Sequence, residues 1–345
     1  MRLQHLSLTT DPGLEDVALD ELRELAGPTV AGVLRPDGRA GHLRVEGEGD
    51  LLGSALRMRS IHHIVRPIAE FAVPDAEPLR AIRSAIAEIA PAIPEFGPVE
   101  ATFRVTCARS GDHPFTSEQV EREAGAGVRD ALPRAVRLKG MDVEVRCDVR
   151  GDRAQVGVQL TGRSLSRRPG VYRPHTSLRA NVAWAMLALA HLDAPPTRLL
   201  DPFVGAGTIL SEAAARWPQV GLFGSDREAR TATGARQNLG DRAEIREGDA
   251  RRLGQVWPDH TFDLLVTNPP FGHRLAGDAD LGSLYRAFLE GAADRAEPGA
   301  RLVVLAQRRG DFNRALRAVD RWETRHVRMI ELGGLYVGLF VLALR

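Results

Sequence analysis

The second half of the chain alternates apolar strands with helical stretches, and this regularity restricts its possible folds more than any other feature. Its strands are predicted near residues 198–200, 220–226, 243–247, 262–267 and 300–306. Strands that alternate with helices form a parallel sheet with helices on both faces. The last two predicted strands, 323–332 and 335–344, are separated only by Gly333-Gly334. We therefore expect an α/β fold whose parallel sheet carries an antiparallel C-terminal hairpin.

The first half of the chain is organised differently. Residues 1–72 predict the order β-α-β-β-α-β, which is typical of a ferredoxin-like domain. In that domain Asp11 is expected to cap the first helix. Residues 73–165 predict a second small α/β domain, and the proline- and glycine-containing residues 166–177 predict an irregular linker. The strand–helix alternation then fills a C-terminal domain of residues 178–345.

Composition limits the cofactors and locations to expect. The chain contains only Cys107 and Cys147, with no Cys-x-x-C pair. We therefore expect neither a disulfide framework nor a metal site, and a cytoplasmic location fits. No run reaches the roughly 18 apolar residues of a membrane span. No heptad pattern or long apolar face indicates an obligate protein partner, so a monomer is expected.

One segment is basic although the whole chain is nearly neutral. A net charge of +1 gives no general attraction to polyanions. Residues 153–192, however, contain no Asp or Glu. The arginines of this segment are Arg153, Arg163, Arg167, Arg168, Arg173 and Arg179. The segment is either a solvated linker or a surface that contacts nucleic-acid phosphates, and both interpretations stay open here.

A glycine-containing loop follows the first strand of the C-terminal domain. The sequence Asp-Pro-Phe-Val-Gly-Ala-Gly-Thr begins at Asp201 and places Gly205 and Gly207 where a strand turns into a helix. Glycines there let the backbone approach a ligand closely. Leu210 stands where the dinucleotide fingerprint has its third glycine, and no Gly-Lys-Ser/Thr follows. The loop therefore favours neither NAD nor a Walker A phosphate site.

Three successive strands of this domain end in a carboxylate, namely Asp201, Asp226 and Asp249. Ligands of such folds bind at the carboxyl ends of the parallel strands. Asp226 lies 19 residues beyond Gly207, and an acid about 20 residues downstream is the position that holds ribose hydroxyls. Asp249 can accept a hydrogen bond from an adenine amino group. Each acid alone could equally cap a helix, but the series indicates a ligand with a ribose and an adenine.

The fourth strand ends in Asn268-Pro269-Pro270-Phe271. The Asn268 side chain offers an amide oxygen, and Pro269 has a carbonyl but no N–H, so both are acceptors. Two adjacent acceptors suit an exocyclic amino group, which carries two N–H donors. Phe271 offers a flat face for stacking of a base, and Pro270 helps to restrict the backbone. The tetrapeptide therefore predicts a site that holds a planar amine.

These motifs, in this order, resemble those of class I S-adenosylmethionine-dependent amino-methyltransferases. In the first half, residues 103–109, 113–117 and 161–168 resemble a THUMP domain and the junction that follows it. The whole chain is similar to the THUMP-containing tRNA guanine-N2 methyltransferases that act at position 6 of the acceptor stem. This resemblance implies a Rossmann-like methyltransferase domain behind ferredoxin-like and THUMP domains. It also implies S-adenosylmethionine as the cofactor and tRNA as the substrate.

The resemblance assigns roles to single residues. Around the cofactor it implies contacts from Asp201, Phe203, Gly205, Gly207, Asp226, Arg227, Asp249, Ala250 and Asn268. Of these, Asp226 would bind the ribose and Asp249 the adenine. The catalytic group would be Asn268, Pro269, Pro270 and Phe271, with phenylalanine where many relatives have tyrosine. RNA would be contacted by Arg163, Arg167, Arg168, Arg173 and Arg274.

Two alternatives stay open from the sequence. The tetrapeptide suits methylation of adenine N6 equally well, so the chain could be an adenine-N6 DNA or RNA methyltransferase, and only the N-terminal half favours tRNA. A different class of protein, a non-catalytic RNA-binding protein that retains the cofactor fold, is the other alternative. The intact motifs at the strand ends count against it.

Overall fold

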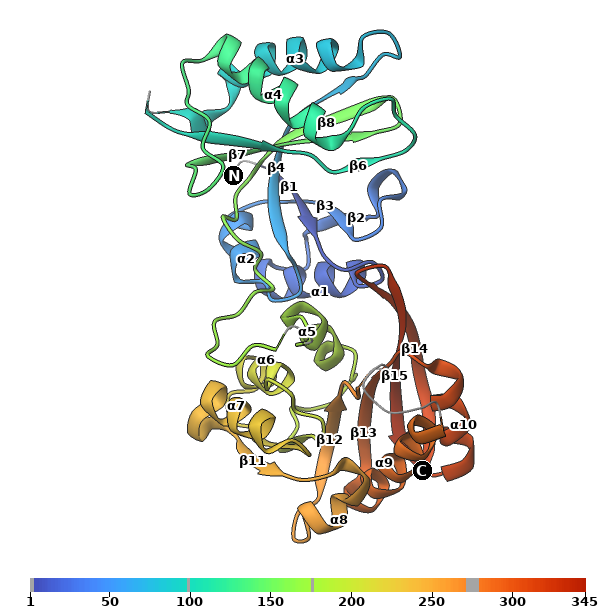
Figure 1. Cartoon of the computed structure of the whole chain (residues 1–345). Coiled ribbons are helices and arrows are strands. Elements are labelled where there is room, and N and C mark those ends of the chain that lie inside the picture. Colours follow the sequence, from blue (N-terminus) through green and yellow to red (C-terminus); the bar gives the residue numbers. More distant parts are fainter. Residues whose placement is uncertain (1–2, 98–99, 175–176, 271–278) are drawn as a thin grey trace.

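The computed structural model describes residues 3–97, 100–174, 177–270 and 279–345. Its strands form two sheets, which Figure 1 shows as an upper, N-terminal part and a lower, C-terminal part. Within the described ranges, no helix combines the length and apolar character that crossing a membrane requires. In the same ranges, no three histidine, cysteine or carboxylate side chains are grouped so as to hold a metal ion.

The N-terminal part begins with a ferredoxin-like unit, as predicted. Its elements are β1 (Gln4–Thr9), α1 (Glu15–Ala26), β2 (Ala31–Leu34), β3 (His42–Gly47), α2 (Leu51–Arg57) and β4 (His63–Ala72). The strands lie in the order β2-β3-β1-β4, and every neighbouring pair is antiparallel. The apolar side chains of α1 and α2 pack on these strands in a core of their own.

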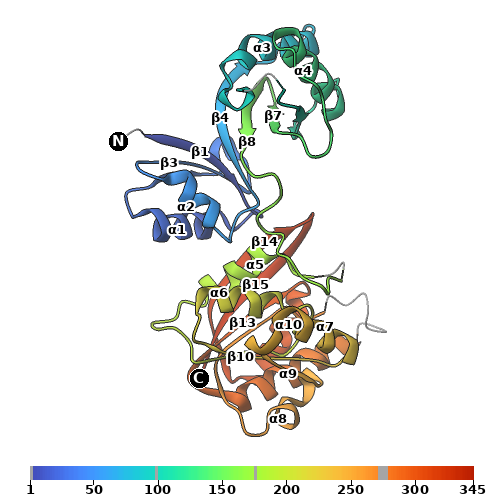
Figure 2. The same ribbon diagram turned by 90° about the vertical axis from the view of Figure 1, so that its left-hand side faces the viewer.

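The THUMP-like unit extends the same sheet. Its elements are α3 (Pro78–Ile89), β5 (Phe103–Thr106), β6 (Arg109–Ser110), α4 (Ser117–Ala131), β7 (Val143–Arg150) and β8 (Arg153–Gln159). Strand β8 pairs antiparallel with β4, so the sheet continues through β8, β7 and β5. Helices α3 and α4 cover this part, and α1 and α2 cover the ferredoxin-like part (Figure 2). The domain limits at residues 72, 165 and 177 stay a prediction.

The C-terminal part is the expected parallel sheet with an antiparallel end. Its elements are α5 (Ala180–Ala188), β9 (Arg198–Asp201), α6 (Thr208–Arg216), β10 (Gly221–Asp226), α7 (Ala229–Leu239), β11 (Glu244–Glu247), α8 (Leu253–Val256), β12 (Phe262–Thr267), α9 (Ala279–Arg295), β13 (Ala296–Ala306), α10 (Arg309–Val319), β14 (Trp322–Leu332) and β15 (Leu335–Leu344). The strand order is β11-β10-β9-β12-β13-β15-β14. Strands β9 to β13 pair in parallel, whereas β15 is antiparallel to β13 and to β14.

Strand β12 shows why its sequence is largely apolar. Leu264 and Val266 face one core, which also contains α5, α6 and α7. Phe262 and Leu265 face the other core, which contains α8, α9 and α10. Because helices cover both faces of a parallel sheet, apolar side chains on both faces of its central strands are buried, and in β12 only Asp263 is half-buried. The end of β12 is therefore held from both sides.

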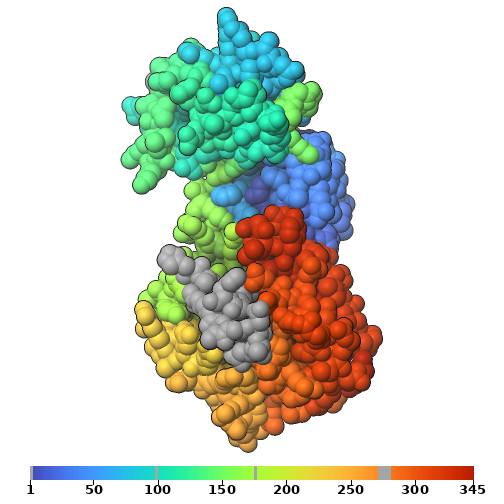
Figure 3. Space-filling view, turned by 45° about the vertical axis from the view of Figure 1, so that its right-hand side comes forward, coloured from blue at the N-terminus to red at the C-terminus, as the bar shows by residue number. Residues whose placement is uncertain are grey.

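The two parts of the chain meet at helix α1 and the β14–β15 hairpin. Leu14, directly before α1, and Val17 of α1 belong to the core of the C-terminal part, beside Ile330 of the hairpin. Arg328 of β14 binds the Asp16 carboxylate, with Nη2 2.7 Å from Oδ2. In Figure 3 the hairpin, in red, touches the blue N-terminal part. Both apolar packing and an ion pair thus fix this contact.

The prediction that Asp11 caps the first helix is wrong. Helix α1 begins at Glu15 and has no side-chain cap. The Asp11 carboxylate instead accepts hydrogen bonds from Asn181 Nδ2 at 2.8 Å and from Arg179 Nη1 at 2.6 Å. Asp11 is 3% exposed, and a buried carboxylate requires partners of this kind. These two partners belong to the C-terminal part of the chain, whereas His62, whose Nε2 lies 3.3 Å from Oδ2, belongs to the N-terminal part, so Asp11 joins the two parts.

A second polar contact between the parts is centred on Glu212 of α6, whose side chain is fully buried. Its Oε1 accepts hydrogen bonds from Arg59 Nη2 at 3.1 Å and from Arg168 Nε at 3.0 Å. Arg59 lies between α2 and β4, and Arg168 lies in the predicted linker. Arg168, predicted as an RNA contact, is thus engaged with a buried carboxylate.

Replacement of Glu212 by alanine should destabilise the protein by about 1–3 kcal/mol, because it leaves two guanidinium groups without their carboxylate. The upper end of the usual range is not expected, since the side chains of Arg59 and Arg168 are 28% and 25% exposed. Urea denaturation would measure the effect. Glu24→Ala is the matched control, because Glu24 is 62% exposed and lies 3.8 Å from Arg216. Equal midpoints for the two variants would refute a stabilising role of Glu212.

Candidate active site

The carboxyl ends of β9, β10 and β12 form one edge of the second sheet. Strand β9 lies between β10 and β12, and the chain proceeds from β9 to β10 and β11 on one side and to β12 and β13 on the other. A crevice outside the strand ends is expected at such a reversal of strand order. The register of Leu264 beside Leu199 and Leu265 beside Leu200 brings the ends of β12 and β9 together. The glycine loop and the Asn-Pro-Pro segment therefore face the same crevice.

Asp201 joins these two segments. It is 1% exposed, and its Oδ1 accepts a hydrogen bond from Thr267 Oγ1 at 2.6 Å and from Phe203 N at 3.1 Å. Burial, together with the nearby charge of Asp226, raises the pKa of Asp201 to about 7. Thr267 directly precedes Asn268, so one carboxylate fixes the start of the cofactor loop and the residue before the tetrapeptide.

The glycine loop has the backbone that the sequence predicted. Gly205 and Gly207 have φ angles of 53° and 80°, a region that favours glycine. Gly207 also lies so close to Leu239 of α7 that an added Cβ would be 2.7 Å from its Cδ1. Helix α6 starts directly after this loop, and the first N–H groups of a helix have no partner within it. The loop can therefore approach a ligand closely.

Asp226 is tied to the same loop. Its Oδ2 accepts a hydrogen bond from Gly205 N at 3.3 Å, and its Oδ1 accepts one from Glu228 N at 3.0 Å. Burial raises the pKa of Asp226. A carboxylate with two oxygens has about four acceptor positions, and only two are used by these bonds. Asp226 can therefore accept further hydrogen bonds from a pair of hydroxyl groups. Arg227, which follows it, is exposed.

Asp249 is engaged more fully. Its Oδ1 accepts a hydrogen bond from Arg251 N at 2.9 Å, and its Oδ2 lies 2.6 Å from Arg251 Nη2. The hydrogen bond from the Arg251 side chain lowers the pKa of Asp249. The capping role that the sequence left open is thus present, at the start of a short helical turn that begins with the buried Ala250. A hydrogen bond from an adenine amino group would have to be made in addition.

Asn268 is the residue whose surroundings indicate a ligand most directly. Its Oδ1 is buried and has no hydrogen-bond partner among the described residues. A buried acceptor without a partner costs about 1–3 kcal/mol, and such atoms in a folded protein call for an explanation. Pro269 is buried beside it, and Pro270 is half-buried. Phe271, predicted to stack on the base, and Arg274 lie outside the described residues.

The predicted RNA contacts differ in their surroundings. Arg163, Arg167 and Arg173 are exposed, and none of them forms an ion pair with a described residue. Arg168, in contrast, is bound to Glu212. Clustered guanidinium groups without acid partners remain available for phosphate.

The sequence did not single out Thr267 or Asn238, although both hold the site together. A threonine at the end of the largely apolar run Phe262–Val266 was a signal for the first. For Asn238, which supports the loop as described below, the sequence contains no comparable signal, because its partners lie 32 and 66 positions away.

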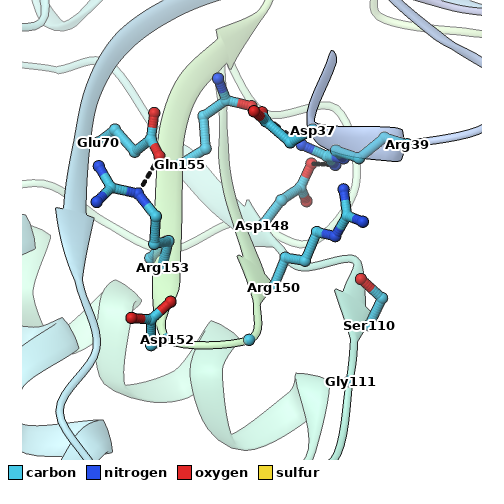
Figure 4. Close-up of a pocket in the computed structure, with 12 residues that line it drawn as sticks. Asp37, Arg39, Glu70, Ser110, Gly111, Asp148, Arg150, Asp152, Arg153 and Gln155 are labelled. Atoms are coloured by element: carbon cyan, nitrogen blue, oxygen red, sulfur yellow. Dashed lines mark hydrogen bonds and ion pairs between the residues drawn. The ribbon is translucent and has the colours of Figure 1, made fainter. Parts of the chain in front are cut away.

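A separate pocket of 620 Å³ lies in the first sheet, between the ferredoxin-like and THUMP-like units (Figure 4). Its charged side chains are largely paired with one another. Arg39 binds Asp148 and Gln155, and Arg153 binds Glu70. The pocket does not reach the strand ends that carry Asp201 and Asn268. The ion pairs and hydrogen bonds among its side chains explain why polar residues line it.

Asp201 makes stability depend on pH. Its folded pKa of about 7 lies above the ordinary 3.8, so the folded state holds the proton more tightly. The contribution of Asp201 to the free energy of unfolding is fully present below about pH 4, falls as the pH rises to 7 and is then constant. Asp201→Asn removes this dependence, so the variant should gain on the order of 2–4 kcal/mol relative to wild type between pH 4 and 7. Urea denaturation of both proteins at several pH values tests this; a constant difference would contradict it.

Comparison with known proteins places this site in context. The RMKL-like methyltransferase domain matches residues 167–338, and the THUMP domain matches residues 84–159. A curated protein of Thermus thermophilus, a tRNA (guanine(6)-N2)-methyltransferase, is 39% identical, and the match covers 98% of each chain. A protein of the same description from Archaeoglobus fulgidus is 27% identical over 96% of this chain and 90% of its own. The crystal structure of TrmN from Thermus thermophilus superposes with a TM-score of 0.83 at 36% identity and covers 100% of both chains.

Proposed function

The chain belongs to the family of THUMP-containing tRNA guanine-N2 methyltransferases, and from this we propose that it methylates the N2 amine of guanosine 6 in tRNA. The methyl donor is S-adenosylmethionine. Sequence similarity over nearly the whole chain supports the reaction, because the match includes both the N-terminal and the C-terminal part of the molecule. The reaction class is therefore an N-methyl transfer to an exocyclic base amine.

The observation that carries the proposal is the buried Oδ1 of Asn268, which has no hydrogen-bond partner within residues 3–97, 100–174, 177–270 and 279–345. It lies at the reversal of strand order, directly after Thr267, which is hydrogen-bonded to Asp201. An exocyclic amino group would supply the missing donor. Because Pro269 has no N–H, its backbone offers a second acceptor and no competing donor.

The residues present fit the methyl donor. Gly205 and Gly207 leave the loop open for close approach, and Asp226 has acceptor positions left for two ribose hydroxyls. Asp201 and Phe203 would border the methionine end, and Asp249 with Ala250 the adenine. S-adenosylmethionine, when bound, supplies the methyl group on a positively charged sulfur.

Asn268 and Pro269 act on the guanine nitrogen, whose lone pair is delocalised into the ring. Two acceptors that hold its two hydrogens favour a more tetrahedral nitrogen and direct the lone pair toward the methyl carbon. Positioning of this kind can contribute up to about 7–11 kcal/mol in ideal cases. The nitrogen becomes acidic when it is methylated, so no strong base is needed to remove its proton.

A substrate series tests the function. Labelled S-adenosylmethionine would be incubated with a tRNA that carries guanosine 6, and with the same tRNA carrying inosine 6. Inosine lacks only the N2 amine, so we expect label in the first RNA and none in the second. Nucleoside mass analysis should identify N2-methylguanosine. Equal labelling of both RNAs would refute the assigned atom.

Duplex DNA and binding assays separate the alternatives. Methylation of adenine in DNA, with no transfer to tRNA, would instead support an adenine-N6 methyltransferase. Failure of the wild-type chain to bind S-adenosylmethionine at millimolar concentration would support a non-catalytic RNA-binding protein. The chain is similar to tRNA methyltransferases over both of its parts, and this similarity favours neither of the two alternative functions.

The remaining features complete the proposal. The exposed Arg163, Arg167 and Arg173 would contact tRNA phosphates, and the amino group would reach Asn268 after the base is flipped out of its stack. We further propose a monomer that acts in the cytoplasm. Light scattering of the purified chain would test the first point, and fractionation of cells the second.

A further inference from the structure

The backbone of the linker between the two parts of the chain is bound to the methyltransferase domain through the side chain of Asn238. Asn238, near the end of α7, accepts hydrogen bonds at Oδ1 from Val171 N at 2.9 Å and Tyr172 N at 3.0 Å. Its Nδ2 donates to Tyr172 O at 2.8 Å and to Ala206 O at 2.9 Å. A side-chain amide has two donors and two acceptor positions. Asn238 therefore uses its full hydrogen-bonding capacity here.

The fourth of these bonds reaches the cofactor loop, because Ala206 lies between Gly205 and Gly207. The same end of α7 supports the loop a second time, where Leu239 lies against Gly207. Asn238 thus connects the linker backbone on one side with the loop backbone on the other. The orientation of its amide is unambiguous, since two N–H groups face one end and two carbonyls face the other.

Tyr172 docks on α7 through a glycine. An added Cβ at Gly234 would lie 2.2 Å from Cγ and 2.3 Å from Cδ1 of the Tyr172 ring. The ring therefore occupies the space that any other residue at position 234 would need. The Tyr172 hydroxyl also lies 3.2 Å from Thr231 Oγ1, one turn earlier on α7. Glycine in a helix interior costs about 1 kcal/mol relative to alanine, and the close approach of the ring explains why it is found here.

We propose that Tyr172 and Asn238 are positioning residues of the cofactor site, which hold the linker on α7 and thereby fix the loop 205–207. The inference rests on the proposed function, because it assigns the loop to S-adenosylmethionine. The docked linker is then a structural part of the cofactor site. Release of the linker should raise the Kd for S-adenosylmethionine and leave turnover at saturating cofactor nearly unchanged.

Gly234→Ala is the sharpest test, because it displaces the Tyr172 ring without removing a polar group. Alanine favours the helix by about 1 kcal/mol, which offsets the packing lost when the Tyr172 ring is displaced, so the unfolding temperature should change little. We expect calorimetry to show an increase of about 10-fold or more in the Kd for S-adenosylmethionine. If the contact had only a structural role, a variant that keeps its thermal stability would also keep its affinity for S-adenosylmethionine.

Asn238→Asp provides a second, independent test. Aspartate has the same shape and keeps both acceptors, but it presents oxygen to the carbonyls of Tyr172 and Ala206. Its Kd should rise at least as much as that of Gly234→Ala. Tyr172→Phe keeps the ring on Gly234 and should stay within about 3-fold of wild type. Gln237→Ala changes an exposed neighbour on the same helix and should bind as wild type does.

The outcomes separate this inference from the proposed function. If wild type binds S-adenosylmethionine and both Gly234→Ala and Asn238→Asp bind it with the same Kd, the positioning role is refuted and the proposed function stands. If wild type itself does not bind, the proposed function fails. A variant that lowers turnover at saturating cofactor as strongly as it raises the Kd would also refute the assigned role.

Discussion

Asn268→Ala should lower the turnover of guanosine-6 tRNA by at least about 100-fold and leave the affinity for S-adenosylmethionine within a few-fold of wild type. The variant removes the buried acceptor for which the described part of the chain offers no partner. An interaction made mainly when the amine is aligned for reaction contributes to turnover rather than to binding of the donor. Single-turnover measurements with saturating cofactor and tRNA would give the rate, and calorimetry the affinity.

Asn268→Asp is the control for this experiment. Aspartate keeps an acceptor oxygen in the same place and replaces the amide NH2 by a second oxygen, so it should retain more activity than alanine does. Alanine also removes a buried acceptor that no described residue satisfies, so the thermal stability of Asn268→Ala should equal or exceed that of wild type. A normal methylation rate in purified Asn268→Ala would end the assignment of the amine to this residue.

The Asp201–Thr267 hydrogen bond explains how the two segments of the site act together. It joins neighbouring strand ends, one of which leads into the cofactor loop and the other into Asn268. Both side chains are buried, so water does not compete for the bond. The position of Asn268 is thus set by a group that lies on the cofactor side of the crevice. Asn238 and Asp226 hold that same loop from two other directions.

The features that the sequence predicted are those with a local signal. Strand ends were identified from apolar runs. Because the carboxyl ends of parallel strands lie at the same edge of a sheet, Asp201, Asp226 and Asn268 were expected at one edge. The hairpin 323–344 followed from its two glycines. The β-α-β-β-α-β order likewise determined the antiparallel sheet of the N-terminal unit.

The features that it did not predict depend on distant pairings. Asp11 is a plausible helix cap in sequence, but its partners are Arg179 and Asn181, 168 and 170 positions away. Arg168 looks like a phosphate contact among other arginines, yet Glu212 is 44 positions downstream. The continuation of one sheet from β4 into β8 depends on the pairing of Val65 with Gln159. No local pattern specifies which distant partner a polar side chain will find.

Asp226→Ala should weaken the binding of S-adenosylmethionine by about 30- to 100-fold, because it removes the acceptor for two ribose hydroxyls. Hydrogen bonds to a charged group contribute about 1.5–3 kcal/mol each, and part of this is offset by water that solvates the free carboxylate. The variant also removes the acceptor of Gly205 N, which adds to the loss by loosening the loop. Calorimetry with the purified chain would measure the Kd.

Two further variants make this prediction specific. Asp226→Asn keeps one acceptor oxygen and should lose less affinity than alanine. Glu247→Ala removes an exposed carboxylate from the end of β11, the neighbouring strand, and should leave the Kd unchanged. At saturating cofactor, Asp226→Ala should recover a turnover close to that of wild type, in contrast to Asn268→Ala. An unchanged Kd would remove Asp226 from the ribose site.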